Sequence, residues 1–173
     1  DEMSLVKPLG SFSILALCSC NSNKNKEFYT TNKSENGFYL ISSPVPKKVV
    51  GYAKEIFVKE KLTGTAIKDV NNLELSEPYS IKENIFSFFI LQNGKSVGTL
   101  KITENNGKLK HQISQGYLEE ELNNIISKDG IYELSFEEKE NGGRPTPIFK
   151  KRDDVPKDKI IYNIKNSIKK IQN

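Results

Sequence analysis

The chain has 173 residues, of which 36% are hydrophobic and 28% are charged, and its formal net charge at pH 7 is +4. This composition is ordinary for a globular protein. The positive excess is nearly all lysine, since Arg144 and Arg152 are the only arginines. Nucleic-acid binders favour clustered arginine with stacking aromatic residues, so we expect no nucleic-acid partner. A lysine-rich surface is either simply solvated or attracted to anionic lipid headgroups.

The N-terminal 20 residues contain a short apolar run, residues 9–17, followed by Cys18 and Cys20. The run is too short to cross a bilayer as a helix. A polar tract rich in Asn, Ser and Lys comes next. This arrangement resembles the signal peptide and lipobox of bacterial lipoproteins, in which a cysteine preceded by a small residue receives the lipid. The resemblance implies that residues 1–19 are a signal peptide and that the protein is lipid-anchored on the extracytoplasmic face of the cell membrane.

The two cysteines differ in how well they fit a lipobox. Cys20 follows Ser19 and has Leu17 three places upstream, whereas Cys18 directly follows Leu17. We therefore expect Cys20 to be the lipidated residue. The alternative is a metal or redox pair, but Cys-x-Cys supplies two of the four ligands that a structural zinc site needs. No further cysteine exists to build a disulfide framework.

Composition divides the remaining chain into two parts. Residues 20–36 begin with the candidate lipid attachment site and continue with Asn, Ser, Thr and Lys, among which only Phe28 and Tyr29 are apolar. Such a segment buries too little surface to order itself, so we expect a flexible tether. Residues 37–173 are long enough for a single domain with its own core.

The first elements of this domain are predicted from short apolar patterns. Residues 38–41 are expected to form a strand. Apolar positions spaced by three and four residues favour an amphipathic helix over 47–61, with a strand as the alternative because of the valines and Gly51. A short strand at 73–75 is expected to end at Glu77-Pro78.

The middle of the chain carries strong hairpin signals. Residues 85–91 form an apolar strand, Asn93-Gly94 favours a type I′ turn, and residues 96–103 return antiparallel. A second turn, at 105–107, leads to a third strand over 108–114. The sequence therefore predicts a three-stranded meander.

The last third of the chain contains both the three-to-four-residue spacing of helices and the alternation of strands. Residues 118–126 have helical spacing, with Ser114 as a candidate N-cap, and residues 131–138 alternate as a strand. Isoleucines at helical spacing from Ile160 to Ile171 predict a final helix, with Asp154 as a candidate cap and Pro156 in its first turn. Antiparallel hairpins mixed with helices indicate the α+β class: an antiparallel sheet with a three-stranded meander, packed by two or three helices.

Catalytic and metal-binding motifs are missing from the sequence. No P-loop, Rossmann glycine pattern, Gly-x-Ser-x-Gly elbow, His-Glu-x-x-His or EF-hand spacing occurs. The single histidine, His111, is either a pH-sensitive group or general base, or a partly buried residue satisfied by a neighbouring polar group; we expect the second. We expect no enzyme activity, no cofactor and no metal.

Two segments are candidates for ligand binding. The segment Gly142–Phe149 is expected to be a loop stiffened by two prolines, and it offers Arg144, Ile148 and Phe149. Proline lowers the entropy lost on binding. The acidic run Glu119, Glu120 and Glu121 could contact a cationic partner. Both segments also have a purely structural explanation. The first could be a stiff connector, and the second could be the acidic first turn of a helix.

The chain resembles small exported lipoproteins of low-GC Gram-positive bacteria, and among these it is similar to lantibiotic immunity lipoproteins. The resemblance lies in Ser76–Ile81, Phe88–Lys95, Val97–Leu100 and Leu122-Asn123. It implies interception of an antimicrobial peptide at the membrane, although the net positive charge opposes simple electrostatic capture of a cationic peptide. The alternative is an accessory protein or propeptide-like inhibitor of an exported enzyme. The expected partners are thus a membrane, through the lipid anchor, and a peptide or exported protein.

Overall fold

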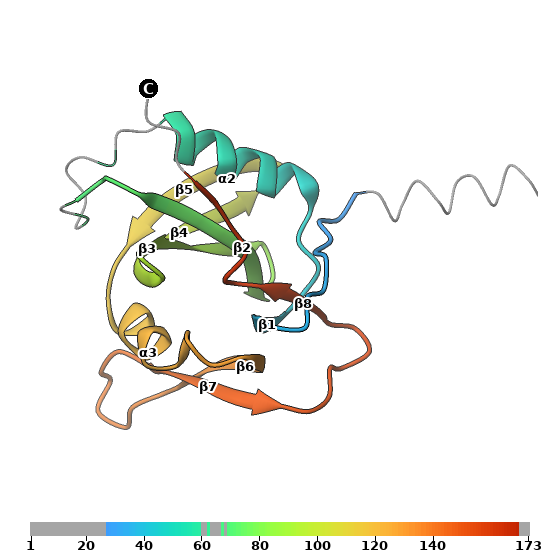
Figure 1. Cartoon of the computed structure of the whole chain (residues 1–173). Coiled ribbons are helices and arrows are strands. Elements are labelled where there is room, and N and C mark those ends of the chain that lie inside the picture. Colours follow the sequence, from blue (N-terminus) through green and yellow to red (C-terminus); the bar gives the residue numbers. More distant parts are fainter. Residues whose placement is uncertain (1–26, 60–61, 63–66, 68, 170–173) are drawn as a thin grey trace, which may run out of the picture.

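The computed structural model of the chain describes residues 27–59, 62, 67 and 69–169. The expected signal peptide and Cys20 lie outside these residues. Within them, no helix has the length and apolarity needed to cross a membrane. The described chain forms two β-sheets with two helices packed on them (Figure 1).

The elements follow one another as a strand, a helix, four strands, a second helix and four more strands. Their bounds are β1 Phe38–Ser42, α2 Lys47–Lys59, β2 Leu73–Lys82, β3 Ile85–Gln92, β4 Lys95–Asn105, β5 Lys108–Ser114, α3 Tyr117–Ile125, β6 Gly130–Glu137, β7 Thr146–Arg152, β8 Ile160–Asn163 and β9 Ser167–Lys169.

The strands divide between a five-stranded sheet and a four-stranded sheet. The five-stranded sheet has the order β5-β4-β3-β2-β9 and is antiparallel throughout. The four-stranded sheet has the order β7-β6-β1-β8, in which β1 and β6 pair parallel and the other pairs are antiparallel. The α+β class is confirmed, but the fold is mainly β, and two sheets replace the single sheet that the sequence predicts.

Helix α2 covers one face of the five-stranded sheet. Its buried residues recur every three or four positions, so they lie on one side of the helix. They join the inward residues of β2, β3 and β4 in one apolar cluster, which includes Val49, Ala53, Phe57, Leu75, Phe88, Ile90, Leu100 and Ile102. The sequence prediction of a helix that starts at Lys47 is confirmed.

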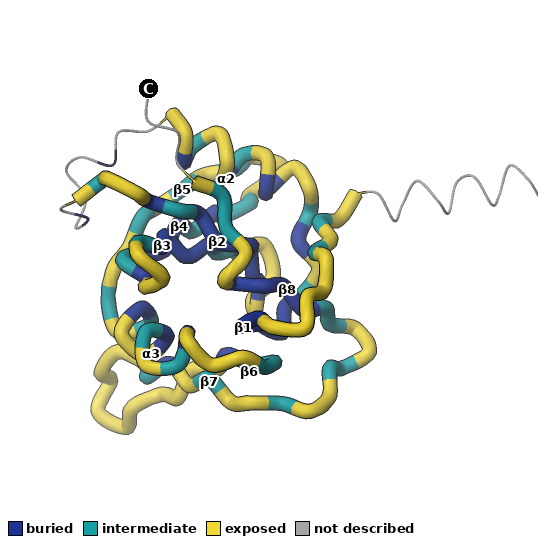
Figure 2. Tube along the Cα trace, viewed as in Figure 1, coloured by how far each residue is buried: buried dark blue, intermediate teal, exposed yellow. Residues whose placement is uncertain are grey.

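The opposite face of the same sheet packs against α3 and the four-stranded sheet. Tyr79 and Phe89 from the five-stranded sheet meet Leu122 of α3 and Phe38 and Tyr132 of the four-stranded sheet. The rings of Phe38 and Tyr132 stack with centroids 4.4 Å apart. Figure 2 shows the buried stretches of β1, β2, β3 and β8 gathered in the middle of the molecule, with exposed loops around them.

Both predicted Asn-Gly turns are confirmed. Asn93 and Gly94 have φ of 51° and 77°, and Asn106 and Gly107 have φ of 50° and 74°. Positive φ at both central residues is the requirement of a type I′ turn, which asparagine and glycine meet at the lowest cost. These turns connect β3 to β4 and β4 to β5.

Strand β2 continues through Pro78, where the sequence predicts a break. The register against β3 shifts between Leu75 and Pro78, so a bulge lies there. The side chain of Ser76 substitutes for a backbone acceptor, since its Oγ receives the amide N–H of Phe89 at 2.9 Å. A bulge is a position where proline, which lacks an N–H, is tolerated within a strand.

The predicted C-terminal helix over 160–171 is wrong. Residues 160–163 form β8, which pairs with β1, and residues 167–169 form β9, which pairs with β2. Isoleucine is β-branched and favours strands, and both sheets offer a free edge here. Asp154 caps no helix and instead accepts hydrogen bonds from Arg152. Ile171 lies outside the described residues.

Two boundary predictions in the second half are also wrong. Ser114 does not cap α3, because it ends β5 and pairs with Thr99. The helix begins after Gly116, whose N–H donates to the carboxylate of Glu119. The segment from Thr146 onward is strand β7 rather than loop, since it pairs with β6 along its length.

The described half of the expected tether is attached to the domain. Phe28 forms an antiparallel bridge with Pro46. The N–H of Tyr29 donates to Val45 O, and the N–H of Lys47 donates to Glu27 O, each at 2.8 Å. Residues 27–31 are therefore held against the domain rather than forming part of a flexible tether. Residues 20–26 of the expected tether lie outside the described residues.

Replacing Phe57 with alanine tests the orientation of α2. Phe57 is buried in the cluster under the helix, so Phe57→Ala should lower the free energy of unfolding by about 3–5 kcal/mol. Its neighbour Val58 is 50% exposed, so Val58→Ala should change the free energy of unfolding by less than about 0.5 kcal/mol. Urea unfolding measures both, and similar losses in the two variants would contradict this orientation.

Candidate functional site

The residues predicted to bind a ligand do not form one patch. Phe149 points into the core, where its ring lies 6.3 Å from that of Phe38. Ile148 precedes it on β7, so its side chain points to the opposite face of the sheet, away from α3. Arg144 is exposed in the turn before β7.

The acidic run on α3 is also divided. Glu119 is buried, and its carboxylate accepts hydrogen bonds from Thr99 Oγ1 at 2.5 Å and from Gly116 N at 2.7 Å. It therefore serves the start of the helix and its attachment to β4. Glu120 and Glu121 are exposed. Only these two remain accessible to a partner.

His111 has the environment that the sequence predicts. It is partly buried, and its Nδ1 lies 3.1 Å from the hydroxyl of Tyr52 on α2. The centroids of the Tyr52 and His111 rings are 6.1 Å apart. The histidine therefore joins β5 to α2 through a neighbouring polar group.

The most concentrated polar constellation of the described chain surrounds Glu77, which the sequence prediction missed. Glu77 lies in the bulge of β2 and is 5% exposed. Its Oε1 accepts hydrogen bonds from Tyr29 Oη at 3.0 Å and from Thr31 Oγ1 and Asn166 Nδ2 at 2.7 Å. Its Oε2 accepts the backbone N–H of Asn163 at 2.7 Å.

These donors come from segments far apart in the sequence. Tyr29 and Thr31 belong to the N-terminal segment, Asn163 ends β8, and Asn166 lies in the turn between β8 and β9. Four hydrogen bonds match the roughly four lone-pair sites of a carboxylate. The side chain of Glu77 therefore fastens the N-terminal segment and both C-terminal strands to β2.

The tyrosines beside Glu77 strengthen this junction. Tyr162 Oη accepts the N–H of Val45 and donates to the carbonyl oxygen of Tyr29, both at 3.0 Å. Burial raises the pKa of Tyr29 well above its ordinary value, and the charge of Glu77 raises it further. Burial also raises the pKa of Tyr162. Both hydroxyls therefore remain protonated donors further into the alkaline range than an exposed tyrosine would.

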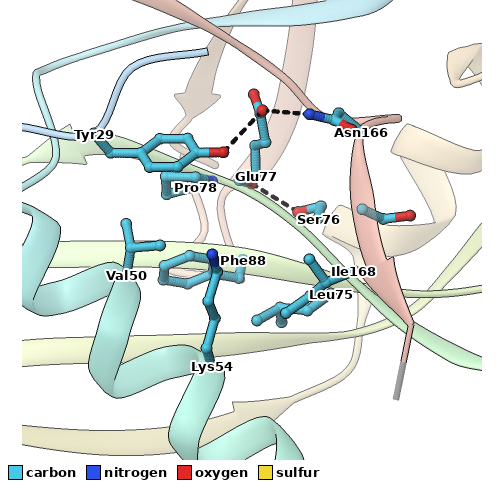
Figure 3. Close-up of a pocket in the computed structure, with 11 residues that line it drawn as sticks. Tyr29, Val50, Lys54, Leu75, Ser76, Glu77, Pro78, Phe88, Asn166 and Ile168 are labelled. Carbon is cyan, nitrogen blue, oxygen red and sulfur yellow. Dashed lines mark hydrogen bonds between the residues drawn. The ribbon is translucent and has the colours of Figure 1, made fainter. Parts of the chain in front are cut away.

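A small pocket of about 50 Å³ opens next to this carboxylate. Figure 3 shows Glu77 between Tyr29 and Asn166 at one side and an apolar wall at the other, with the side chain of Lys54 extending from α2. The wall is lined by Val50, Leu75, Phe88 and Ile168. Ligand sites usually measure about 300–1,000 Å³, so this pocket has room for little more than water.

The chemistry available around Glu77 is that of a structural junction. Its acceptor sites are occupied by neutral donors of the protein itself. Within the described residues, no buried side-chain nitrogen or oxygen lacks a partner, and no group of three His, Cys, Asp or Glu residues could hold a metal ion. Glu77 is 5% exposed and four donors of the protein engage its carboxylate, so it is poorly placed to exchange a proton with a substrate.

Comparison with known proteins assigns no family to the chain. No protein-family model matches the sequence, and neither a curated protein nor a solved structure is significantly similar to it.

Replacing Glu77 with glutamine tests the junction. Glu77→Gln puts an amide NH₂ where donors now converge, so the free energy of unfolding should fall by about 2–4 kcal/mol. The N-terminal segment should also detach, so trypsin should cleave after the exposed Lys33 faster than in the wild type.

The exposed Glu83, in the turn after β2, provides the matched control, and Glu83→Gln should change neither quantity. Unchanged stability and cleavage in Glu77→Gln would show that the carboxylate does not hold these segments together.

The raised tyrosine pKa values predict a loss of stability at high pH. A buried tyrosine whose folded pKa exceeds the unfolded value of about 10 stabilises the fold below that pH, and the stabilisation is lost as the pH rises above it. The free energy of unfolding should therefore fall above about pH 10, and it should fall less steeply in Tyr29→Phe. The exposed Tyr117→Phe is the control. A slope in Tyr29→Phe equal to that of the wild type would contradict the assignment.

Proposed function

We propose that the protein is a lipoprotein of the extracytoplasmic membrane face, attached through Cys20 after removal of signal peptide 1–19, and that it is a non-catalytic binding module. One observation carries the proposal: a short apolar run, residues 9–17, is followed directly by Ser19-Cys20 and a polar tract. The structure adds that the chain is fastened to the domain by Glu77 and by backbone hydrogen bonds from Glu27 onward. Only residues 21–26 then separate the lipidated cysteine from the folded part.

This spacing limits how far the domain can move from the bilayer. Seven Cα–Cα steps from Cys20 to Glu27 span at most about 25 Å when fully extended. The domain is therefore held next to the lipid surface, which is where membrane-active peptides act. Immunity against an antimicrobial peptide fits this location better than capture of a partner far from the membrane.

Recognition in this proposal uses the surface rather than a deep pocket. The pocket beside Glu77 is too small for a peptide, and the carboxylate is occupied. Two exposed apolar side chains at the β6–β7 edge, Phe136 and Ile148, lie on opposite faces of the sheet, and each offers a contact for a peptide or an exported protein. The meander of β3, β4 and β5, packed by α2 and α3, serves as the rigid scaffold.

The lipid anchor and its purpose are tested together in cells. Cys20→Ser should abolish incorporation of a labelled fatty acid and release the protein from the membrane fraction, whereas Cys18→Ser should do neither. Cells that produce the wild-type protein should tolerate severalfold more of a cationic membrane-active peptide than cells that produce Cys20→Ser. Growth inhibition across a panel of such peptides measures this.

The outcomes separate the parts of the proposal. Loss of labelling in Cys18→Ser, with labelling kept in Cys20→Ser, would move the anchor to Cys18. Absence of label from the wild type and from both variants would reject the anchor. Equal peptide sensitivity in all strains would reject immunity and favour inhibition of an exported enzyme, which the purified protein would then show.

A further inference from the structure

Helix α2 has an outward side with an unusual combination of residues. On its exposed side lie Lys47, Lys48 and Lys59, the acidic Glu55, and Val58, which is 50% exposed; Lys54, at the flank, extends toward the pocket beside Glu77. Lys48 pairs with Glu104 of β4 and Lys59 pairs with Glu55. After these pairs are formed, the outward side keeps a small positive excess, from Lys47 and from Lys54 at its flank, and it carries the apolar Val58 among the lysines.

A second apolar residue lies next to the start of this helix. Phe28 is 41% exposed and is bridged to Pro46, directly before α2. Phe28 and the first turn of α2 lie at a groove of about 450 Å³. The groove is lined by Glu27, Phe28, Pro46, Lys47 and Lys48. Aromatic and aliphatic side chains among lysines are the composition of helices that lie on membrane surfaces.

The position of the anchor places this surface near lipid. The N-terminal segment enters the domain beside the first turn of α2, as Figure 1 shows. The length of chain between Cys20 and Glu27 keeps this corner within about 25 Å of the lipid. The first turn of α2 and Phe28 adjoin Glu27, where the described chain begins.

We propose that the outward side of α2, with Phe28, docks onto the anionic lipid headgroups of the membrane to which the protein is anchored. This inference rests on the proposed lipid anchor and adds an orientation to it. Lysines near an anionic surface favour binding by about fivefold each, and Val58 and Phe28 would enter the headgroup region. The four-stranded sheet lies on the far side of the five-stranded sheet from α2, so Ile148 would face away from the membrane, toward a partner.

Lipid-quenching fluorescence on the full lipoprotein tests the orientation. In the lipidated mature protein Cys20 is blocked and Cys18 has been removed, so a cysteine introduced by Val58→Cys is the single reactive thiol. It is labelled with an environment-sensitive fluorophore and the protein is reconstituted into vesicles that contain a quencher lipid. Ile148→Cys, on the opposite side of the molecule, provides the matched position.

The expected result is quenching at position 58 and not at position 148 in vesicles that contain phosphatidylglycerol. Replacing Lys47 and Lys59 with glutamine should shift the docking equilibrium about fivefold for each lysine toward the undocked form and reduce the quenching. Glutamines at Lys108 and Lys110, exposed residues of β5, should leave it unchanged. Pure phosphatidylcholine vesicles should show weaker quenching at position 58.

Three results would overturn the inference. Equal quenching at positions 58 and 148 would show that α2 does not face the lipid. Quenching at position 58 that is unchanged by the Lys47 and Lys59 substitutions would show that α2 does not dock by charge. Self-quenching between labelled copies without lipid quenching would show that a second copy covers α2. A reactive Cys20 thiol with loss of vesicle binding would instead reject the anchor itself, and this outcome is distinguishable because the protein then appears in solution.

Discussion

The carboxylate of Glu77 joins three parts of the chain to strand β2. It receives Tyr29 and Thr31 from the N-terminal segment, the backbone of Asn163 at the end of β8 and the side chain of Asn166 before β9. Burying a charge is costly unless hydrogen bonds replace its water. The cost of burying Glu77 is offset only when all these segments are in place, so the carboxylate makes their folding cooperative.

This constraint has a consequence beyond stability. Because the N-terminal segment is fixed from Glu27, the domain is joined to the proposed lipid by a short span, and the side of the molecule that faces the bilayer is restricted. The basic outward side of α2 lies beside that attachment point, while the four-stranded sheet lies beyond the five-stranded sheet. In the proposed lipoprotein, this junction in the core would determine which surface faces the lipid and which faces a partner.

Local signals in the sequence predict part of this fold, and long-range contacts explain the rest. The Asn-Gly turns and the spacing of Val49, Ala53 and Phe57 are local, so β3, β4, β5 and α2 are predicted correctly. The isoleucines from Ile160 have helical spacing, yet the segments that contain them pair with the free edges of the two sheets and form β8 and β9. Glu77 was missed because a single glutamate before proline resembles a turn, and nothing in the sequence shows that its donors lie 46 or more positions away.

Amide hydrogen exchange tests the central claim most directly, namely that Glu77 joins the N-terminal segment to the C-terminal strands. In the wild-type protein, the amides of Tyr29, Lys47 and Asn163 should exchange slowly, because each donates to a partner within this junction. In Glu77→Gln all three should lose protection together, while amides in the β3–β4 hairpin keep theirs. Exchange at the unprotected rate for Tyr29 in the wild type, or loss of protection at Asn163 alone in the variant, would contradict the account.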